Sequence, residues 1–209
     1  MLFRSPAALA AAVLVGLLED APGRYRSPAE TLHYLNSRLA ERLPNTSFVT
    51  MFYALLDLRT GEMSYSSAGH DPAILFRADG RFEALPATGM VLGVTPAAEY
   101  REEKRTLAPG DLVFSYTDGL TDMRNEVGDR LGFERARYLV ATRAKLPCSE
   151  LVEAVVRAAR DETATAPDDI MLVATRYLGA PSPSELPPLP EEEVPMALAA
   201  GKGAPWRPV

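Results

Sequence analysis

The 209-residue sequence contains a single cysteine, Cys148, which excludes an internal disulfide and is consistent with a reducing, cytoplasmic compartment. It has only two histidines, and neither lies in a motif that pairs with Cys148, so we do not expect a thiol nucleophile. Basic residues are also scarce, because 22 Lys and Arg stand against 28 Asp and Glu, for a net charge of -6. Without a basic surplus to neutralise phosphates, nucleic acid is not an expected partner.

The sequence also lacks an apolar run of the roughly 20 residues that a membrane-spanning helix needs. The longest apolar run, Ala7 to Leu18, stops at Glu19-Asp20. Arg4 before this run resembles the basic start of a signal peptide, but Ala21-Pro22-Gly23 makes a poor cleavage site. We therefore expect a buried core helix here and no membrane partner, with an export signal as the alternative.

The remaining composition is that of an ordinary globular protein, with 47% hydrophobic and 24% charged residues. The character changes at Gly179, where prolines become frequent, helical and strand periodicity ends, and the acidic run Glu191 to Glu193 appears. The sequence therefore predicts one domain over residues 1–178 and a Pro-rich, disordered tail over residues 179–209.

Helical patterns flank a middle region rich in strand patterns. The predicted helices are Ala7 to Leu18, a segment that starts after Ser27 as N-cap and ends at Pro44, Phe133 to Thr142, and Ser149 to Asp161 with Ser149 as its cap. The predicted strands are Phe48 to Leu58 as a central strand, Glu62 to Ala68, Ala73 to Arg77, Phe82 to Leu85, Glu99 to Leu107 as an exposed edge strand, a strand ending at Asp118, and Asp169 to Tyr177. Helices at both ends of a hairpin-connected sheet indicate an α+β sandwich.

Carboxylates gather where two of these apolar strands end, at Asp118 and at the pair Asp168-Asp169. A Thr-Asp-Gly turn can simply cap itself, which is the competing interpretation of Asp118. Two adjacent acids that open a buried strand place one carboxylate on each face, and an inward carboxylate needs a cation, a hydrogen-bond cage or a raised pKa. Asp122 follows Asp118 by four residues and could face the same space. The pattern favours a site for a hard divalent cation such as Mg²⁺.

Several segments resemble one known family. Tyr116 to Asp122 resembles the motif YTDG(V/L)TE, Asp168 to Val173 resembles DDITLLV, and Ser67 to Pro72 resembles SAGHPP. These are motifs of the PPM-type, or phosphatase 2C-like, metal-dependent serine/threonine phosphatases, in their bacterial SpoIIE/RsbU branch. The resemblance runs in order from about Pro6 to Tyr177.

The resemblance implies an αββα sandwich, two antiparallel sheets flanked by helices, with a metal cleft at one edge. Two Mg²⁺ or Mn²⁺ ions would activate water for hydrolysis of a phosphoserine or phosphothreonine protein, so that no side chain acts as nucleophile. The residues that match metal ligands are Asp118 and Asp168, followed by Asp122 for a third, weaker ion and by Asp169 at a neighbouring position. Anti-anti-sigma factors are frequent substrates in this branch, which implies a role in signalling or sigma-factor control.

Three residues match site-shaping positions of the same motifs. Gly119 would let the backbone pass close to the metal cluster, and Gly69 belongs to the turn of the SAGHPP-like segment. His70 would shape that turn beside the cleft as a neutral, hydrogen-bonded residue rather than ligate metal.

The sequence departs from the family pattern at its start. Of the motif DVSGKGVPAAL only the tail is matched, by Pro6 to Leu9, and the residue corresponding to the metal-bridging Asp would precede Met1. We therefore predict an N-terminally truncated sandwich that holds at most one ion, bound weakly through one or two carboxylates and water. The missing strands would leave an exposed sheet edge through which the chain could self-associate.

Three functional hypotheses follow from these observations. The first is a phosphatase domain that is incomplete at its N-terminus and hydrolyses phosphoprotein poorly or not at all as this chain stands. The second is a catalytically degenerate member that acts as a regulatory or binding module. The third is a metal-stabilised structural domain without partner chemistry.

Overall fold

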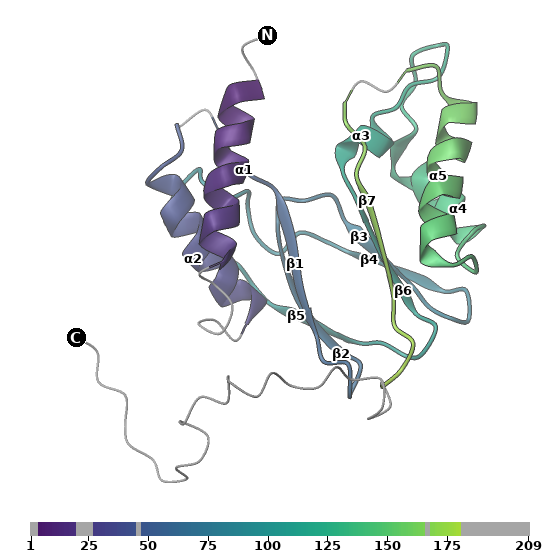
Figure 1. Ribbon diagram of the computed structural model, residues 1–209, viewed down its shortest axis with the longest axis horizontal. Helices are drawn as coiled ribbons and strands as arrows, with labels where there is room; N and C mark the ends of the chain where they lie inside the picture. The colour runs from purple at the N-terminus through teal and green to yellow at the C-terminus, as the bar shows by residue number, and fades with distance from the viewer. Residues whose placement is uncertain (1–3, 20–26, 45–46, 166–167, 181–209) are drawn as a thin grey trace.

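Two antiparallel sheets lie between two pairs of helices in the computed structural model, which describes residues 4–19, 27–44, 47–165 and 168–180 (Figure 1). This arrangement confirms the predicted αββα sandwich. The predicted tail lies outside the described residues from residue 181 onward. None of the described helices is long and apolar enough to cross a membrane.

The first sheet has three strands in the order β1-β2-β5, namely β1 (Met51–Leu56), β2 (Glu62–Ala68) and β5 (Glu103–Thr106). The second sheet has four strands in the order β4-β3-β6-β7, namely β4 (Phe82–Leu85), β3 (Ala73–Phe76), β6 (Leu112–Tyr116) and β7 (Leu172–Arg176). In the second sheet β6 is central, and its Phe114 lies opposite Ile74 on one side and Ala174 on the other. The end of β6, at Ser115 and Tyr116, pairs with β7, while the pairing with β3 stops at Phe114.

Helices α1 (Arg4–Glu19) and α2 (Pro28–Ala40) lie on the first sheet, while α4 (Gly132–Ala141) and α5 (Cys148–Glu162) cover the second (Figure 1). The short helix α3 (Asp118–Thr121) follows β6 directly. As predicted, the Ser27 side chain caps α2 by accepting a hydrogen bond of 3.1 Å from the Glu30 N–H. The predicted Ser149 cap is wrong, because α5 begins at Cys148 directly after Pro147 and has no side-chain cap.

Apolar side chains form three layers of core, one between each helix pair and its sheet and one between the sheets. On α2, Leu32, Leu35 and Leu39 recur at helical spacing and are fully buried against the first sheet. Between the sheets, Tyr65 of β2 and Leu75 of β3 are fully buried in one cluster, and Phe52 of β1 stacks on Tyr65 with centroids 5.3 Å apart. The two sheets therefore share one apolar interior.

The sandwich interior is open along one side, where β1 and β7 are the unpaired edges of the two sheets. The prediction of a long central strand from Phe48 to Leu58 is wrong, because the strand covers only Met51–Leu56 and lies at an edge. Val173 of β7 is turned toward the interior yet 52% exposed. Between the two edges runs an apolar groove of about 280 Å³, here named the β1–β7 groove, lined by Phe52, Ala54, Leu56, Met63, Leu107, Val113, Ser115, Val173 and Thr175.

The opposite edge of the first sheet has a different character. Strand β5 carries the sequence Glu103-Lys104-Arg105-Thr106, and it is the exposed edge strand that the charge pattern predicted, although shorter than expected. Charged side chains along an edge discourage the addition of a further strand. The edge strands β1 and β7 beside the groove have few such charges, so they are less protected than β5 against the addition of a further strand.

Candidate metal centre

The end of strand β6 is locked to the segment that precedes β7. The Thr117 hydroxyl lies 3.2 Å from the carbonyl oxygen of Asp169 and 3.0 Å from the N–H of Met171, and the Thr117 N–H donates to the Met171 carbonyl at 3.0 Å. These contacts extend the antiparallel pairing of Tyr116 with Leu172 beyond the last ladder residue. As a result, the turn that presents Asp118 is fixed against the segment that carries Asp168 and Asp169.

Gly119 makes this contact between the two segments possible. A Cβ atom at this position would lie 2.3 Å from the Asp169 carbonyl oxygen and 2.9 Å from the Asp169 carbonyl carbon. Real Cβ atoms essentially never approach other atoms that closely, and both partners here are backbone. The absence of a side chain therefore lets the first turn of α3 lie directly on the backbone of Asp169.

Asp168 and Asp169 are placed differently from the sequence prediction. Both are exposed and precede β7, which begins only at Leu172, so the prediction that one of them points inward from a buried strand is wrong. The Asp168 carboxylate accepts a hydrogen bond of 2.8 Å from the N–H of Asp169 and so caps its own turn. Asp118 is exposed as well, as the first residue of α3.

Asp122 already has a protein cation as its partner. It ends α3, and its carboxylate lies 2.8 Å from the guanidinium of Arg130. A metal ion at Asp122 would have to compete with this ion pair.

Asp118 shares a small polar pocket with the turn between β2 and β3. The pocket has a volume of about 130 Å³ and is lined by Thr50, Gly69, His70, Asp71, Thr117 and Asp118. Gly69 has φ +59°, and a Cβ there would lie 2.5 Å from Val91 Cγ1, so this turn needs glycine for both conformation and space. The Nδ1 atom of His70 lies 2.8 Å from the Asp71 carbonyl oxygen, and as a donor it orients the ring within its own turn.

Asp71 is the one pocket carboxylate that sequence reasoning missed. Its position next to His70 in the SAGHPP-like turn was the available signal, but the turn was interpreted only for its shape. The structure places this turn at the end of the sandwich where β6 gives way to α3.

The donor chemistry of this region fits a hydrated divalent cation. Carboxylate oxygens suit Mg²⁺ and Mn²⁺, and Mg²⁺ commonly binds through one or two carboxylates while keeping several waters. Over the described parts of the chain, no group of three or more His, Cys, Asp or Glu side chains is arranged to hold an ion. The two carboxylates Asp118 and Asp168 on touching backbone segments therefore fit one weakly held ion and not a pair of ions enclosed by protein ligands.

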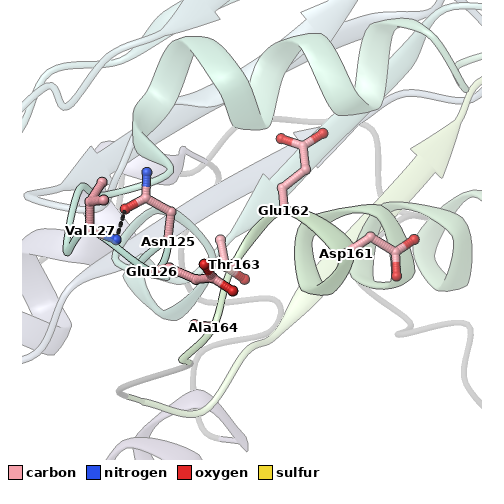
Figure 2. Close-up of a pocket in the computed structure, with 7 residues that line it drawn as sticks. All are labelled: Asn125, Glu126, Val127, Asp161, Glu162, Thr163 and Ala164. Atoms are coloured by element: carbon pink, nitrogen blue, oxygen red, sulfur yellow. Dashed lines mark hydrogen bonds between the residues drawn. The ribbon is translucent and has the colours of Figure 1, made fainter.

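A second pocket, of about 300 Å³, also contains carboxylates but has a different character (Figure 2). It is lined by Asn125, Glu126, Val127, Asp161, Glu162, Thr163 and Ala164. The carboxylates of Asp161 and Glu162 point in different directions, and Glu162 is bound to the Arg135 guanidinium by two hydrogen bonds of 2.6 Å. None of the predicted site residues lines this pocket, so it is separate from the candidate metal centre.

Sequence comparison finds a family model and curated relatives that match this chain. A protein-family model described as Stage II sporulation protein E (SpoIIE) matches residues 5–178. Phosphoserine phosphatase RsbU of Bacillus subtilis (strain 168) is 32% identical over 124 residues, which are 59% of this chain and 37% of that protein. The chain therefore spans little more than a third of this curated relative.

Solved structures show the same fold. A crystal structure of the RsbU and RsbW domains of a Mycobacterium tuberculosis protein matches with a TM-score of 0.71 and 25% identity, over 85% of this chain and 50% of that one. The SiaA-PP2C domain of Pseudomonas aeruginosa matches with a TM-score of 0.70 and 23% identity, over 82% of this chain and 68% of that one.

Proposed function

The chain belongs to the SpoIIE family of PPM-type phosphatases, and from this membership we propose that it is a metal-dependent protein serine/threonine phosphatase domain. The observation that carries the proposal is the junction at Thr117 and Gly119, which holds Asp118 against the segment of Asp168. The substrate we propose is a phosphoserine or phosphothreonine protein of the anti-anti-sigma class, and the compartment is the cytoplasm.

PPM-type phosphatases depend on divalent metal ions, and in this chain Asp118 and Asp168 would hold a Mg²⁺ or Mn²⁺ ion. Such an ion supplies Lewis-acid chemistry, which lowers the pKa of water and neutralises charge on the phosphoryl oxygens. Thr117 binds the Asp169 carbonyl oxygen and so positions Asp118 relative to the segment of Asp168, and His70 holds the turn that lines the same pocket. Asp169 lies beside Asp168 as a further candidate ligand, and Asp122 would become one only by leaving Arg130.

The direct test is hydrolysis of a phosphoserine protein by the 209-residue chain in the presence of Mn²⁺. We expect slow turnover, because two carboxylates hold an ion weakly, and we expect Asp118→Asn to remove it. The matched control is Asp79→Asn. Asp79 is an exposed carboxylate in the hairpin that joins β3 to β4, whereas the pocket lies at the other end of β3. Turnover that survives in EDTA or in Asp118→Asn would contradict the proposal.

A second candidate, a regulatory or binding module, is favoured by the β1–β7 groove. A strand from another chain can pair with an unpaired sheet edge, and such a strand would cover the apolar groove between these two edges. We propose that a second copy of the chain covers it, since both edges carry few of the charges that protect β5.

This proposal predicts concentration-dependent dimers in analytical ultracentrifugation. Val173→Lys places a charge in the β1–β7 groove and should shift the chain to monomers at the same concentration. The matched control is Val127→Lys, because Val127 is 81% exposed but lies outside the groove. A wild-type chain that stays monomeric at high concentration, or dimers that persist in Val173→Lys, would contradict self-association through this groove.

A further inference from the structure

Asp71 has few protein partners for a carboxylate in its position. It is partly buried, in the turn that crosses from β2 of the first sheet to β3 of the second. Among the described residues, its one side-chain hydrogen bond is from the Thr121 hydroxyl to Oδ2, at 3.4 Å. Hydrogen bonds from hydroxyl groups normally span 2.5–3.0 Å, so this bond is weak.

The Thr121 hydroxyl is not fully available to Asp71. It also lies 3.2 Å from the carbonyl oxygen of Asp118, and one hydroxyl proton serves one acceptor well. The Thr121 hydroxyl therefore connects Asp71 to Asp118, the first residue of α3, but leaves the Asp71 carboxylate without a strong hydrogen bond.

Three other partly or fully buried carboxylates have a cation beside them, whereas the partly buried Glu102 has no ion pair among the described residues. Asp111 pairs with Arg77 at 2.8 Å, Glu83 with Arg105 at 2.6 Å and Asp122 with Arg130 at 2.8 Å. Asp71 has no Lys, Arg or His within ion-pair distance in the described parts of the chain. A partly buried negative charge without a counterion is costly, and a bound cation would offset that cost.

The surroundings of Asp71 place its charge next to the candidate metal centre. It lines the 130 Å³ pocket together with Asp118, and it also lines an adjoining pocket with the buried Tyr116. A phenol carries no positive charge, so Tyr116 provides no counterion for Asp71.

We propose that Asp71 is an additional positioning carboxylate of the metal centre, which helps to hold a hydrated divalent cation in the pocket that it lines together with Asp118. The described carboxylates do not form a direct three-ligand cage, so Asp71 acts through the water that a Mg²⁺ or Mn²⁺ ion keeps. This inference rests on the proposed metal-dependent function and assigns a residue that the site motifs left out.

The test is the affinity of the full chain for Mn²⁺, measured by isothermal titration calorimetry, together with the melting temperature without metal. Asp71→Asn keeps the shape of the side chain and its contact with Thr121 but removes the charge. We expect the Mn²⁺ affinity to fall about tenfold, as for other residues that act on a metal through its ligands. The metal-free melting temperature should stay near that of the wild type, which separates a positioning role from a structural one.

Two further variants make the outcomes distinct. Asp118→Asn should weaken Mn²⁺ binding more than Asp71→Asn, and Asp79→Asn, which removes the same charge at the other end of β3, should leave it unchanged. If Asp71→Asn binds Mn²⁺ as the wild type does while Asp118→Asn does not, the role of Asp71 is wrong and the proposed function stands. If the wild-type chain binds no Mn²⁺ at millimolar concentration, the proposed function and the inference are both wrong.

Discussion

Replacing Asp111 by Ala is expected to lower the free energy of unfolding by about 2–4 kcal/mol, the usual cost of removing one partner of a buried, hydrogen-bonded ion pair. Asp111 directly precedes β6 and is 1% exposed. Its carboxylate accepts hydrogen bonds from the Ala78 N–H at 2.9 Å, the Ala108 N–H at 3.0 Å and the Arg77 guanidinium at 2.8 Å.

The reason for so large an effect is that the Asp111 carboxylate holds the start of β6 to the end of β3 and to the loop after β5, and also holds Arg77. Arg77, at the end of β3, donates both to Asp111 and to the carbonyl oxygen of Thr106 at the end of β5. Without the carboxylate, two backbone N–H groups lose their acceptors and Arg77 retains only Thr106 and the more distant Glu83 at 3.8 Å. The start of β6 would then be anchored only by its strand pairing.

Chemical denaturation of the two chains measures the difference. Asp79→Ala is the matched control, because it also removes an Asp–Arg pair near β3, but both members of that pair are exposed. Exposed ion pairs contribute little, so this control should unfold close to the wild-type midpoint. Equal midpoints for Asp111→Ala and Asp79→Ala would contradict the role assigned to Asp111.

The same network predicts how stability depends on pH. Burial alone would raise the pKa of Asp111, but the hydrogen bonds from Ala108, Ala78 and Arg77 outweigh it and hold the pKa below the ordinary value. A carboxyl whose pKa is lower in the folded chain than in the unfolded one contributes stability above its unfolded pKa of about 3.9, and loses it as the pH falls through the folded pKa. In Asp111→Ala, this part of the acid-induced loss of stability should be absent.

Local patterns predicted much of the fold because most elements agree with their tertiary surroundings. The Leu spacing of α2 and its Ser27 cap encode a helix with one buried face, and the structure has both. The edge position of β1 could not be predicted in this way. Its apolar sequence is typical of a central strand, yet the order of strands in a sheet depends on contacts between distant segments.

The candidate site was predictable in its motifs and not in its geometry. The sequence motifs named Asp118 and Asp168 as candidate ligands, and the backbone contacts at Thr117 and Gly119 bring their segments together. It did not reveal that Asp168 caps its own turn or that Asp122 pairs with Arg130 eight residues later. Such contacts depend on loop conformation, which hydrophobic periodicity does not encode.

Gly119→Ala is expected to damage the metal centre without changing any of its proposed ligands. The new Cβ would lie 2.3 Å from the Asp169 carbonyl oxygen, so α3 and the Asp168–Asp169 segment must move apart. We expect Mn²⁺ affinity to fall about 10- to 100-fold, the range seen when the support of metal ligands is disturbed. Overpacking of this kind also costs about 1–3 kcal/mol of stability, which thermal unfolding without metal would detect.

Gly16→Ala is the matched control for this substitution. Gly16 is also helical, but in the described part of the chain no atom beyond its neighbours and its own helix backbone lies within 4 Å of the position that its Cβ would occupy. Alanine loses less backbone conformational entropy than glycine when it enters a helix, so Gly16→Ala should stabilise the chain by about 0.5–1 kcal/mol and leave Mn²⁺ binding unchanged. The two variants therefore make the same chemical change with opposite expected effects on stability. If Gly119→Ala bound Mn²⁺ as tightly as the wild type, the close contact between α3 and the Asp168–Asp169 segment would not determine metal binding. The carboxylates of these two segments would then act as independent surface charges.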